Sequence, residues 1–312
     1  MEFALGTRAR ALGPGSKLGV VSLASCADRA SLEAGCRALR DLSGWQVMPP
    51  IATPNDGDFA GTAEARAAAL MQMWQGSDVA AIVCARGGYG SNYLLPLLDF
   101  QALKAAPKAF VGCSDNTSLL LALDRAGIVS FHGPMAASDF ASGRADARSF
   151  CAALGGEALD FNFSAESGVR SFVDGEARGP LTGGCLSLVV TALGTPWEIE
   201  TSGKILFLED VNEKPFRIDR MLMHLLLAGK FRGVRGIIFG AMRGCSPQSS
   251  GEGALPELIL RILGGLGVPI VFGVPSGHVL SGNLTLPFGV PAMLQSSRSG
   301  VRLQVERATL NV

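Results

Sequence analysis

The chain has 312 residues, of which 48% are hydrophobic and 17% are charged, so it is a globular protein with room for two domains. Lys+Arg and Asp+Glu number 27 each, and no charge run interrupts the sequence. This balance excludes a basic stripe for nucleic acid or for a membrane surface, and no apolar run has the length of a membrane helix. We therefore expect neither nucleic acid nor a membrane as partner.

Seven cysteines and three histidines are dispersed along the chain without a C-x-x-C motif. This spacing predicts no zinc site and no disulfide framework, and it is typical of a reducing cytoplasm. Leu23-Ala24-Ser25-Cys26 resembles a lipoprotein cleavage site. The apolar core before it has only about five residues, fewer than a signal peptide needs, so we interpret it as a first strand. We expect a cytoplasmic protein without metal or cofactor.

The first half alternates strands with helices. The predicted strands are Lys17–Ala24, Trp45–Met48, Val79–Cys84, Ala109–Gly112 and Ile128–Phe131. One helix is predicted over Ser31–Leu42, and a second helix is capped by Thr62 and ends at Gln75. This alternation predicts a doubly wound α/β domain, which we assign to residues 1–158.

The second half has a different character. Residues 159–180 are irregular and rich in Gly, Ser and Asp, so we assign them as a linker region before a C-terminal domain of residues 181–312. That domain mixes strands and helices. Its predicted strands are Lys204–Leu208, Gly236–Gly240, Pro269–Gly273, Ala292–Gln295 and Val301–Arg307, and its predicted helices are Cys185–Leu193 and Arg217–Ala228.

A strand, a tight turn and a leucine-rich helix follow one another around Ser114. This layout is typical of a nucleophile elbow, although the G-x-S-x-G pattern is matched by Gly112 and not by Asn116. The alternative is a helix N-cap formed by Ser114 or Asp115, and this stretch alone favours the cap. Cys113 stands directly before the apex residue of the turn, and a residue in that position points away from the site. We therefore interpret Cys113 as a small side chain that fills space in the core.

Gly87-Gly88-Tyr89-Gly90 follows the predicted strand Val79–Cys84. The carboxyl ends of parallel strands share one edge of a sheet, so this loop and Ser114 are expected to lie at one site. A phosphate-binding loop is one interpretation, but the spacing matches neither known glycine motif. The other interpretation is that the glycines let backbone N–H groups approach an oxyanion.

A serine nucleophile needs a base, and the three histidines differ in context. His278 lies in a Pro/Gly loop after a strand, where a rigid scaffold holds catalytic residues, and it is the preferred base. His132 ends a strand, and packing or positioning is favoured over catalysis; we expect it to face its own domain. His224 lies within an apolar helix and is expected to be structural and buried.

An acid is also needed to orient the base. Glu209 is the first polar residue after the apolar run Leu206–Leu208, so it is the preferred acid at a strand end. The alternative is a salt bridge to Arg217 or Arg220, a role that also fits the neighbouring acids Asp210 and Glu213.

Several ordered segments together resemble one family over nearly the whole chain. They are Phe59-Ala60-Gly61-Thr62, Arg86 to Gly90, Gly112 to Asp115, His132-Gly133-Pro134, Gly194 to Trp197, Leu208 to Glu213, Arg217 to Leu222 and Gly277-His278. The family is the LD-carboxypeptidases, also called murein tetrapeptide carboxypeptidases, which are related to the microcin C self-immunity peptidases.

The resemblance implies a flavodoxin-like N-terminal domain and a C-terminal domain of mixed strands and helices. It implies a Ser-His-Glu triad of Ser114, His278 and Glu209, with an oxyanion hole formed by the backbone N–H groups of Asp115 and Gly88. It also implies a cytoplasmic homodimer that uses no metal. The implied reaction releases the terminal D-Ala from a murein tetrapeptide, as in cell-wall recycling.

Three alternatives remain open at this point. Within the enzyme class, the substrate could be a microcin-type peptidyl nucleotide. Outside it, the same fold could serve as a non-catalytic sensor of wall peptides. The third is a nucleotide-binding module that uses Gly87–Gly90, in which Ser114 only caps a helix.

Overall fold

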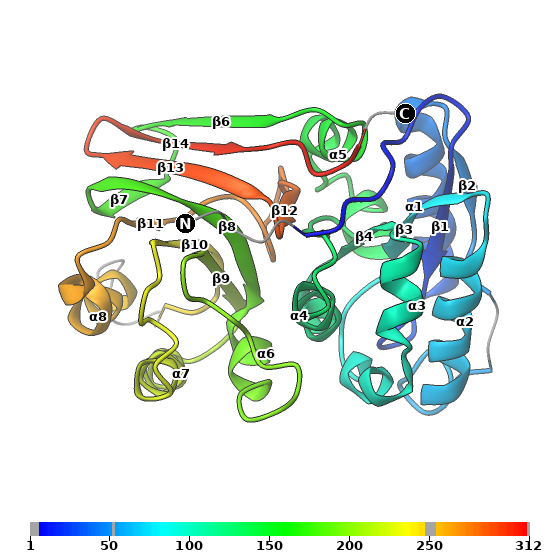
Figure 1. Ribbon diagram of the computed structural model, residues 1–312, viewed down its shortest axis with the longest axis horizontal. Helices are drawn as coiled ribbons and strands as arrows, with labels where there is room; N and C mark the ends of the chain where they lie inside the picture. The colour runs from blue at the N-terminus through cyan, green and yellow to red at the C-terminus, as the bar shows by residue number, and fades with distance from the viewer. Residues whose placement is uncertain (1–5, 52–53, 247–253, 311–312) are drawn as a thin grey trace.

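The computed structural model describes residues 6–51, 54–246 and 254–310, which form two β-sheets lying side by side (Figure 1). The first sheet has the strand order β12-β5-β4-β3-β1-β2. Its strands are β1 (Lys17–Val21), β2 (Gln46–Met48), β3 (Val79–Cys84), β4 (Ala109–Gly112), β5 (Ser130–His132) and β12 (Leu286–Phe288). Strands β1 to β5 are parallel in the order 2-1-3-4-5, so the predicted flavodoxin-like fold is confirmed.

Helices connect these strands, as the βαβ pattern requires. They are α1 (Arg29–Ser43), α2 (Ala63–Gln75), α3 (Phe100–Ala105), α4 (Thr117–Arg125) and α5 (Ala147–Leu154), with the shorter turns η1 (Ser91–Leu97), η2 (Ser114–Asn116) and η3 (Ala136–Phe140). Thr62 caps α2 as predicted, because its hydroxyl accepts from the Ala65 N–H at 3.2 Å. Within the described ranges, no helix combines the length and hydropathy needed to cross a membrane.

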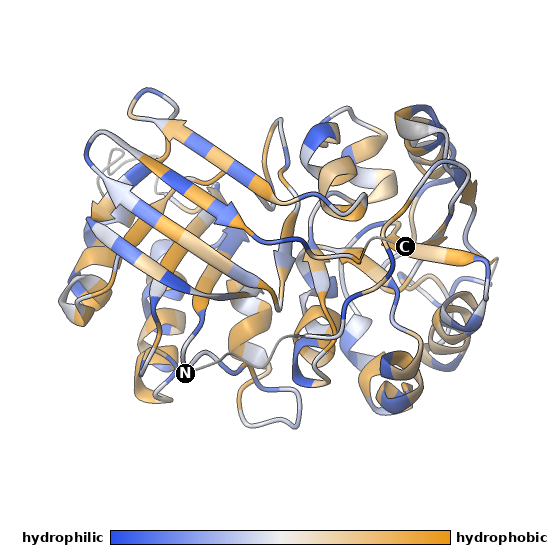
Figure 2. Ribbon diagram, turned by 45° about the horizontal axis from the view of Figure 1, so that its top comes forward, coloured by the Kyte–Doolittle hydropathy of each residue, from blue (hydrophilic) through white to orange (hydrophobic). Residues whose placement is uncertain are grey.

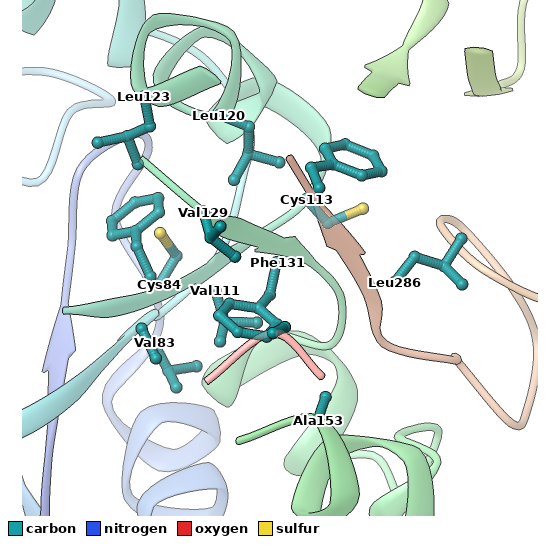
Figure 3. Packing of buried hydrophobic residues seen from close by; sticks show 14 of the residues in the cluster. Val83, Cys84, Val111, Cys113, Leu120, Leu123, Val129, Phe131, Ala153 and Leu286 are labelled. Atoms are coloured by element: carbon teal, nitrogen blue, oxygen red, sulfur yellow. The ribbon is translucent and has the colours of Figure 1, made fainter. Parts of the chain in front are cut away.

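The parallel strands are buried on both faces, which explains their continuous apolar runs. All four residues of β4 are buried, as are five of the six residues of β3. Figure 3 shows side chains of these strands packed against Leu120 and Leu123 of α4. A rigid core therefore lies directly under the turn that carries Ser114.

Strand β12 joins the first sheet although it comes from the second half of the chain. It runs antiparallel to β5, with Leu286 opposite His132 and Phe288 opposite Ser130. Leu286 is fully buried. The sequence analysis missed this strand because three residues are too few for a periodic pattern, and Pro287 argues against a strand.

The second sheet has the order β6-β14-β13-β8-β9-β10-β11-β7. Its strands are β6 (Leu159–Ser164), β7 (Arg170–Val173), β8 (Gly175–Cys185), β9 (Ile205–Val211), β10 (Gly236–Arg243), β11 (Ile270–Phe272), β13 (Pro291–Ser297) and β14 (Gly300–Val305). Strands β8 to β11 are parallel neighbours and the other pairs are antiparallel. The Ser296 hydroxyl of β13 donates to the Ser171 hydroxyl of β7 at 2.6 Å, so the sheet curls until these strands meet.

Residues 159–180 are not irregular, contrary to the expectation from composition. They form β6, β7 and the first part of β8. Leu159, Phe161 and Phe163 alternate with polar residues, a period of two that could have revealed β6. Figure 2 shows such alternating hydropathy along the antiparallel strands of this sheet. The division of the chain into domains at this segment stays a prediction.

Three helices accompany the second sheet: α6 (Leu186–Thr191), α7 (Pro215–Leu227) and α8 (Ala254–Leu263), with a short turn η4 (Gly264–Leu266). The expectation that His224 is buried in α7 is wrong, because this histidine is exposed. The buried side of α7 is formed by Ile218, Leu222 and Leu225, at helical spacings of four and three. His224 falls beside that stripe, so the apolar neighbours in sequence are not its neighbours in the core.

Candidate active site

The backbone makes a sharp turn directly after β4. Cys113 is still extended, with φ −152° and ψ 174°, whereas Ser114 has a φ of +59°, in the left-handed region that side chains other than glycine disfavour. The chain then enters η2 and α4. This strand–turn–helix geometry is the predicted nucleophile elbow, and it exposes the serine hydroxyl at the carboxyl edge of the sheet.

The helix-cap alternative does not fit the contacts. The residue in the cap position of α4 is Asn116, and no side-chain cap bond is formed at either η2 or α4. The Asp115 carboxylate instead accepts from the backbone N–H of Ser91 at 2.7 Å. The Ser114 hydroxyl is therefore available for another partner.

That partner is His278, which reaches the serine from the second half of the chain. His278 Nε2 lies 3.1 Å from Ser114 Oγ, and His278 Nδ1 lies 2.7 Å from Glu209 Oε2. Glu209 is at the carboxyl end of β9, and His278 is in the loop between β11 and β12. The three predicted side chains thus form one continuous chain of hydrogen-bond distances, which is the geometry of a serine–histidine–acid triad.

Glu209 is fully buried, so its charge depends on its partners. Burial raises the pKa of this carboxyl, but the hydrogen-bonded His278 and the nearby imidazole of His132 outweigh burial and lower the pKa to about 2. The backbone N–H of His278 is a further donor to this carboxylate, at 3.2 Å. Glu209 is consequently ionised at every pH near neutrality.

The imidazole of His278 is tuned in the opposite direction. Burial lowers the pKa of His278, but the hydrogen bond and charge of Glu209 raise it by more. The pKa of His278 therefore lies above its usual value. The carboxylate accepts from the proton on Nδ1, which assigns the lone pair to Nε2 in the neutral ring. This tautomer directs the basic nitrogen at Ser114.

The glycine loop after β3 packs tightly against the elbow. A Cβ on Gly87 would lie 2.7 Å from Ser114 Cβ and 3.3 Å from the backbone nitrogen of Asp115. Gly88 follows with a φ of +115°. Among the described residues, no acceptor pairs with the N–H of Gly88 or with that of Asp115. Both predicted oxyanion donors are therefore unpaired beside the serine.

A cavity of about 300 Å³ opens over the serine. It is bordered by Ser114, His278, Gly87 and Gly88, and its charged lining residues are Arg86, Arg144, Arg243, Asp28 and Asp139. Asp115 does not line it, whereas Gly88 does. A second groove of about 980 Å³ shares His278, Val279 and Arg243 with this cavity but does not reach Ser114.

Comparison with known proteins agrees with this geometry. The LD-carboxypeptidase N-terminal domain matches residues 18–133, and the LD-carboxypeptidase C-terminal domain matches residues 178–294. A probable murein peptide carboxypeptidase from Bacillus subtilis is 35% identical over 302 residues, which cover 95% of this chain and 93% of the relative. The chain belongs to the LD-carboxypeptidase family.

Solved structures of the LD-carboxypeptidase fold superpose on nearly all of the chain. The muramoyltetrapeptide carboxypeptidase from Oxalobacter formigenes has a TM-score of 0.85 at 29% identity, covering 95% of this chain and 100% of its own. An MccF-like protein from Bacillus anthracis has a TM-score of 0.86 at 25% identity, covering 96% and 99%. The similarity to both branches of the family agrees with the resemblance seen in the sequence.

The other acids of this LD-carboxypeptidase have different partners. Asp210 is buried and accepts from the backbone N–H groups of Ser187 at 2.9 Å and Val211 at 2.8 Å. Burial raises the pKa of Asp210, and these hydrogen bonds only partly oppose that rise. Glu213 lies 3.6 Å from Arg217, so the salt-bridge alternative describes Glu213 and not Glu209.

Cys113, Glu209 and His278 bring their ligand-type atoms within 4.8 Å of one another, a group that could in principle hold a metal ion. A cysteine binds metal as a thiolate. Burial and the nearby Glu209 raise the pKa of Cys113 well above its usual value, so this thiol stays protonated. The 2.7 Å contact between Glu209 and His278 also uses the atoms that a metal would need. The group is thus better suited to proton transfer.

His132 does not face only its own half of the chain, contrary to expectation. Its Nδ1 lies 3.2 Å from Ser276 Oγ and its Nε2 lies 3.8 Å from Glu209 Oε1. His132 is fully buried. The position of His132 at the end of β5, beside β4, indicated that it lies near the site. Its contact with an acid 77 residues away could not be predicted, because that contact depends on how the two sheets meet.

Proposed function

We propose that this protein is a serine carboxypeptidase that releases the terminal D-Ala of a murein tetrapeptide by cleaving the L,D-peptide bond. The observation that carries the proposal is the continuous Ser114–His278–Glu209 chain at 3.1 and 2.7 Å. The names of the related murein peptide carboxypeptidase and muramoyltetrapeptide carboxypeptidase support the substrate class.

In the proposed mechanism, Ser114 Oγ attacks the carbonyl carbon of the scissile bond and gives its proton to His278 Nε2. Glu209 holds the imidazole by Nδ1 and stabilises the cation that forms. The imidazolium then gives its proton to the leaving nitrogen of D-Ala. A water, deprotonated by His278, attacks the acyl-enzyme and frees Ser114.

The oxyanion of each tetrahedral intermediate accepts from the unpaired N–H groups of Gly88 and Asp115. These groups are fixed by the backbone, so no side-chain freedom is lost when the charge develops. Removal of one such donor typically costs about 2.7–4 kcal/mol of transition-state stabilisation. The positive end of α4 adds a favourable field behind the elbow.

The charged lining of the cavity fits a peptide end that carries free carboxylates. The Arg86 guanidinium donates to the carbonyl oxygens of Cys26 at 3.0 Å and Gly87 at 3.2 Å and has no carboxylate partner among the described residues. Arg243 is exposed and forms no ion pair with any described residue. Such arginines can bind a carboxylate with two parallel hydrogen bonds.

The direct test is incubation of the pure protein with L-Ala-γ-D-Glu-meso-diaminopimelate-D-Ala and detection of D-Ala by mass spectrometry. We expect D-Ala release by the wild type and none above background by Ser114→Ala. Binding of the tetrapeptide without turnover would favour the non-catalytic sensor. Failure of a fluorophosphonate to label Ser114 would favour the nucleotide-binding module.

A peptidyl nucleotide of the microcin type is the second candidate substrate, supported by the similarity to the MccF-like structure. The same assay with a peptidyl nucleotide in place of the tetrapeptide separates the two. We expect a kcat/KM for the tetrapeptide that exceeds the value for the peptidyl nucleotide. The reverse order would reassign the substrate and leave the triad in place.

We also propose that the enzyme works in the cytoplasm as a homodimer. All seven cysteines are free of disulfides, and five of them are buried, which fits a reducing compartment. Light scattering coupled to size exclusion gives the mass directly. A mass near 32.4 kDa would indicate a monomer and contradict the dimer.

A further inference from the structure

Glu209 presents its two carboxylate oxygens to different partners. Oε2 accepts from the ring and the backbone of His278 at 2.7 and 3.2 Å. Oε1 instead faces His132 Nε2 at 3.8 Å and the thiol of Cys113 at 4.0 Å. A fully buried carboxylate is costly unless both oxygens are compensated, so the partners of Oε1 affect how firmly the acid is held.

His132 can act on this carboxylate but not on a substrate. The ring is fully buried, and it lies between Phe207 and Phe288 with ring centroids 4.9 and 5.7 Å away. It is absent from the residues that line the cavity over Ser114. Any effect of His132 on the reaction therefore passes through its contacts with Glu209 and with Ser276, which lies two residues before His278.

The hydrogen-bond partners of Ser276 fix one proton of the His132 ring. Ser276 is buried, and its hydroxyl donates its single proton to the carbonyl oxygen of Leu284 at 3.0 Å. The same oxygen lies 3.2 Å from His132 Nδ1. Since that hydroxyl has no second proton to give, it accepts from Nδ1–H.

The other ring nitrogen faces a negative charge. In a neutral ring protonated on Nδ1, the lone pair of Nε2 would point at the ionised Oε1 of Glu209 at 3.8 Å, with no hydrogen-bond partner among the described residues. Two electron-rich atoms buried opposite each other repel. A proton on Nε2 removes the repulsion and adds to the compensation that the Cys113 thiol gives to Oε1.

We propose that His132 is a positioning residue that carries a proton on both ring nitrogens and balances the charge of Glu209 through Oε1. Glu209 thereby lies between two imidazoles: His132 holds the carboxylate in place, and the carboxylate in turn orients His278. With its charge balanced by His132, the carboxylate holds His278 as a neutral base ready to accept the Ser114 proton. This inference rests on the proposed function of the triad.

Two further observations agree with this arrangement. Burial raises the pKa of Glu209, yet the neighbouring imidazoles of His132 and His278 lower it to about 2. In the described part of the chain, Glu209 from β9 is the charged group that faces His132, and Ser276 and the two phenylalanine rings are further side-chain contacts. The residues opposite His132 on the neighbouring strands are the uncharged Gly112 and Leu286. No other acid therefore competes for the Nε2 proton.

The protonation state can be measured directly in the wild type. The chain has three histidines, so nitrogen-15 spectra of histidine-labelled protein contain three rings. His132→Gln and His224→Gln assign them, and His224 is exposed on α7. We expect both nitrogens of His132 to be protonated at a pH where His278 has one proton. A His132 ring with a single proton would overturn the proposal.

Kinetics test the role of the contact. His132→Phe keeps the ring volume but removes both donors, and we expect kcat to fall about tenfold to a hundredfold, as for other outer-shell partners of histidine sites. KM should stay unchanged, because the ring does not reach the cavity. The acid limb of kcat/KM should move to higher pH, because the charge of Glu209 then acts on His278 alone and favours its protonated form.

His132→Gln places an amide N–H near the position of Nε2 and should recover part of kcat. His224→Gln is the matched control and should behave as the wild type. A role in packing alone would lower the melting temperature of His132→Phe with wild-type kcat and pH profile, and that result would overturn the proposal. If the wild type releases no D-Ala, the proposed function fails instead, and the nitrogen-15 spectra still decide the state of His132.

Discussion

Ser114 holds a backbone conformation that side chains other than glycine avoid, with a φ of +59°. Such a conformation costs on the order of 1–3 kcal/mol and persists where the surroundings enforce it. Here the enforcing elements are the buried strand β4 and the start of α4. The backbone thus places the Cβ of Ser114 at the site, and the 3.1 Å contact with His278 Nε2 orients the hydroxyl.

Replacement of Ser114 by alanine should abolish turnover and preserve the fold. The substituted residue keeps a Cβ at the same φ, so the melting temperature should change little. The kcat should fall by about 10⁶, the loss seen when a triad nucleophile is removed. Cys113→Ala is the matched control, because its thiol is buried and protonated, and it should retain most of kcat. Near-normal turnover by Ser114→Ala would instead point to Cys113.

Glu209→Gln should lower kcat by about 10⁴, the effect of replacing the triad acid by an amide elsewhere. The amide cannot stabilise the imidazolium of His278. Asp210→Asn is the neighbouring control and should be much milder, because Asp210 accepts backbone N–H groups of Ser187 and Val211. Steady-state kinetics of both variants decide the matter. A severe Asp210→Asn with a mild Glu209→Gln would move the acid by one residue.

At the residue scale, the sequence was informative where a polar residue ends an apolar run. Glu209 and Ser114 both stand directly after buried strands, and the structure brings both to His278. The contact of His132 with Glu209 could not be predicted, because it joins strands of two different sheets. The exposure of His224 was missed because apolar neighbours in sequence do not fix the side of a helix.

At the scale of elements, the strands that are buried on both faces were the easiest to predict. The bounds of β3 and β4 match the expectation residue for residue. The strands β6, β7 and β8 were missed because glycine, serine and aspartate dominate the segment, although β6 alternates with a period of two. Composition thus masked a pattern that side-chain alternation alone reveals.

The close approach of the glycine loop to the elbow gives a test at this scale. Gly87→Ala would place a Cβ 2.7 Å from Ser114 Cβ, so the loop or the serine must move. We expect a loss of about 1–3 kcal/mol in the free energy of unfolding, as for other overpacked sites, together with a lower kcat. Urea denaturation and steady-state kinetics measure the two effects.

Gly13→Ala is the matched control for this change. A Cβ on Gly13 meets no atom within 4 Å, and its φ is not positive. This variant should keep the stability and kcat of the wild type. If Gly87→Ala behaved like Gly13→Ala, the tight packing between the loop and Ser114 would not matter for activity.

For the whole molecule, the decisive feature is that both halves contribute to one site and that the second half adds a strand to the first sheet. Ser114 comes from the first half and Glu209 and His278 from the second, while β12 of the second half completes the edge of the first sheet beside β5. The family resemblance indicated the shared site. The added strand β12 could not be predicted, because it is stabilised by pairing with β5 and not by its own three residues.

A fragment of residues 1–158 should therefore be inactive and should self-associate. It lacks the base and the acid, and it leaves the edge of β5 unpaired, which is a site for aggregation. D-Ala release and light scattering, compared with the full chain, test both statements. D-Ala release by this fragment would contradict the placement of His278 and Glu209 in the triad.

The position of β12 late in the chain also determines when the first sheet is completed during synthesis. Ribosomes extend a chain at about 5–20 residues per second, and its N-terminal residues emerge first. Residues of β1 to β5 emerge long before Leu286–Phe288, so the first sheet waits with one edge uncovered until β12 has been synthesised. His278 emerges only shortly before β12. A nascent chain on the ribosome consequently has no working peptidase until His278 and the strand β12 have both been synthesised.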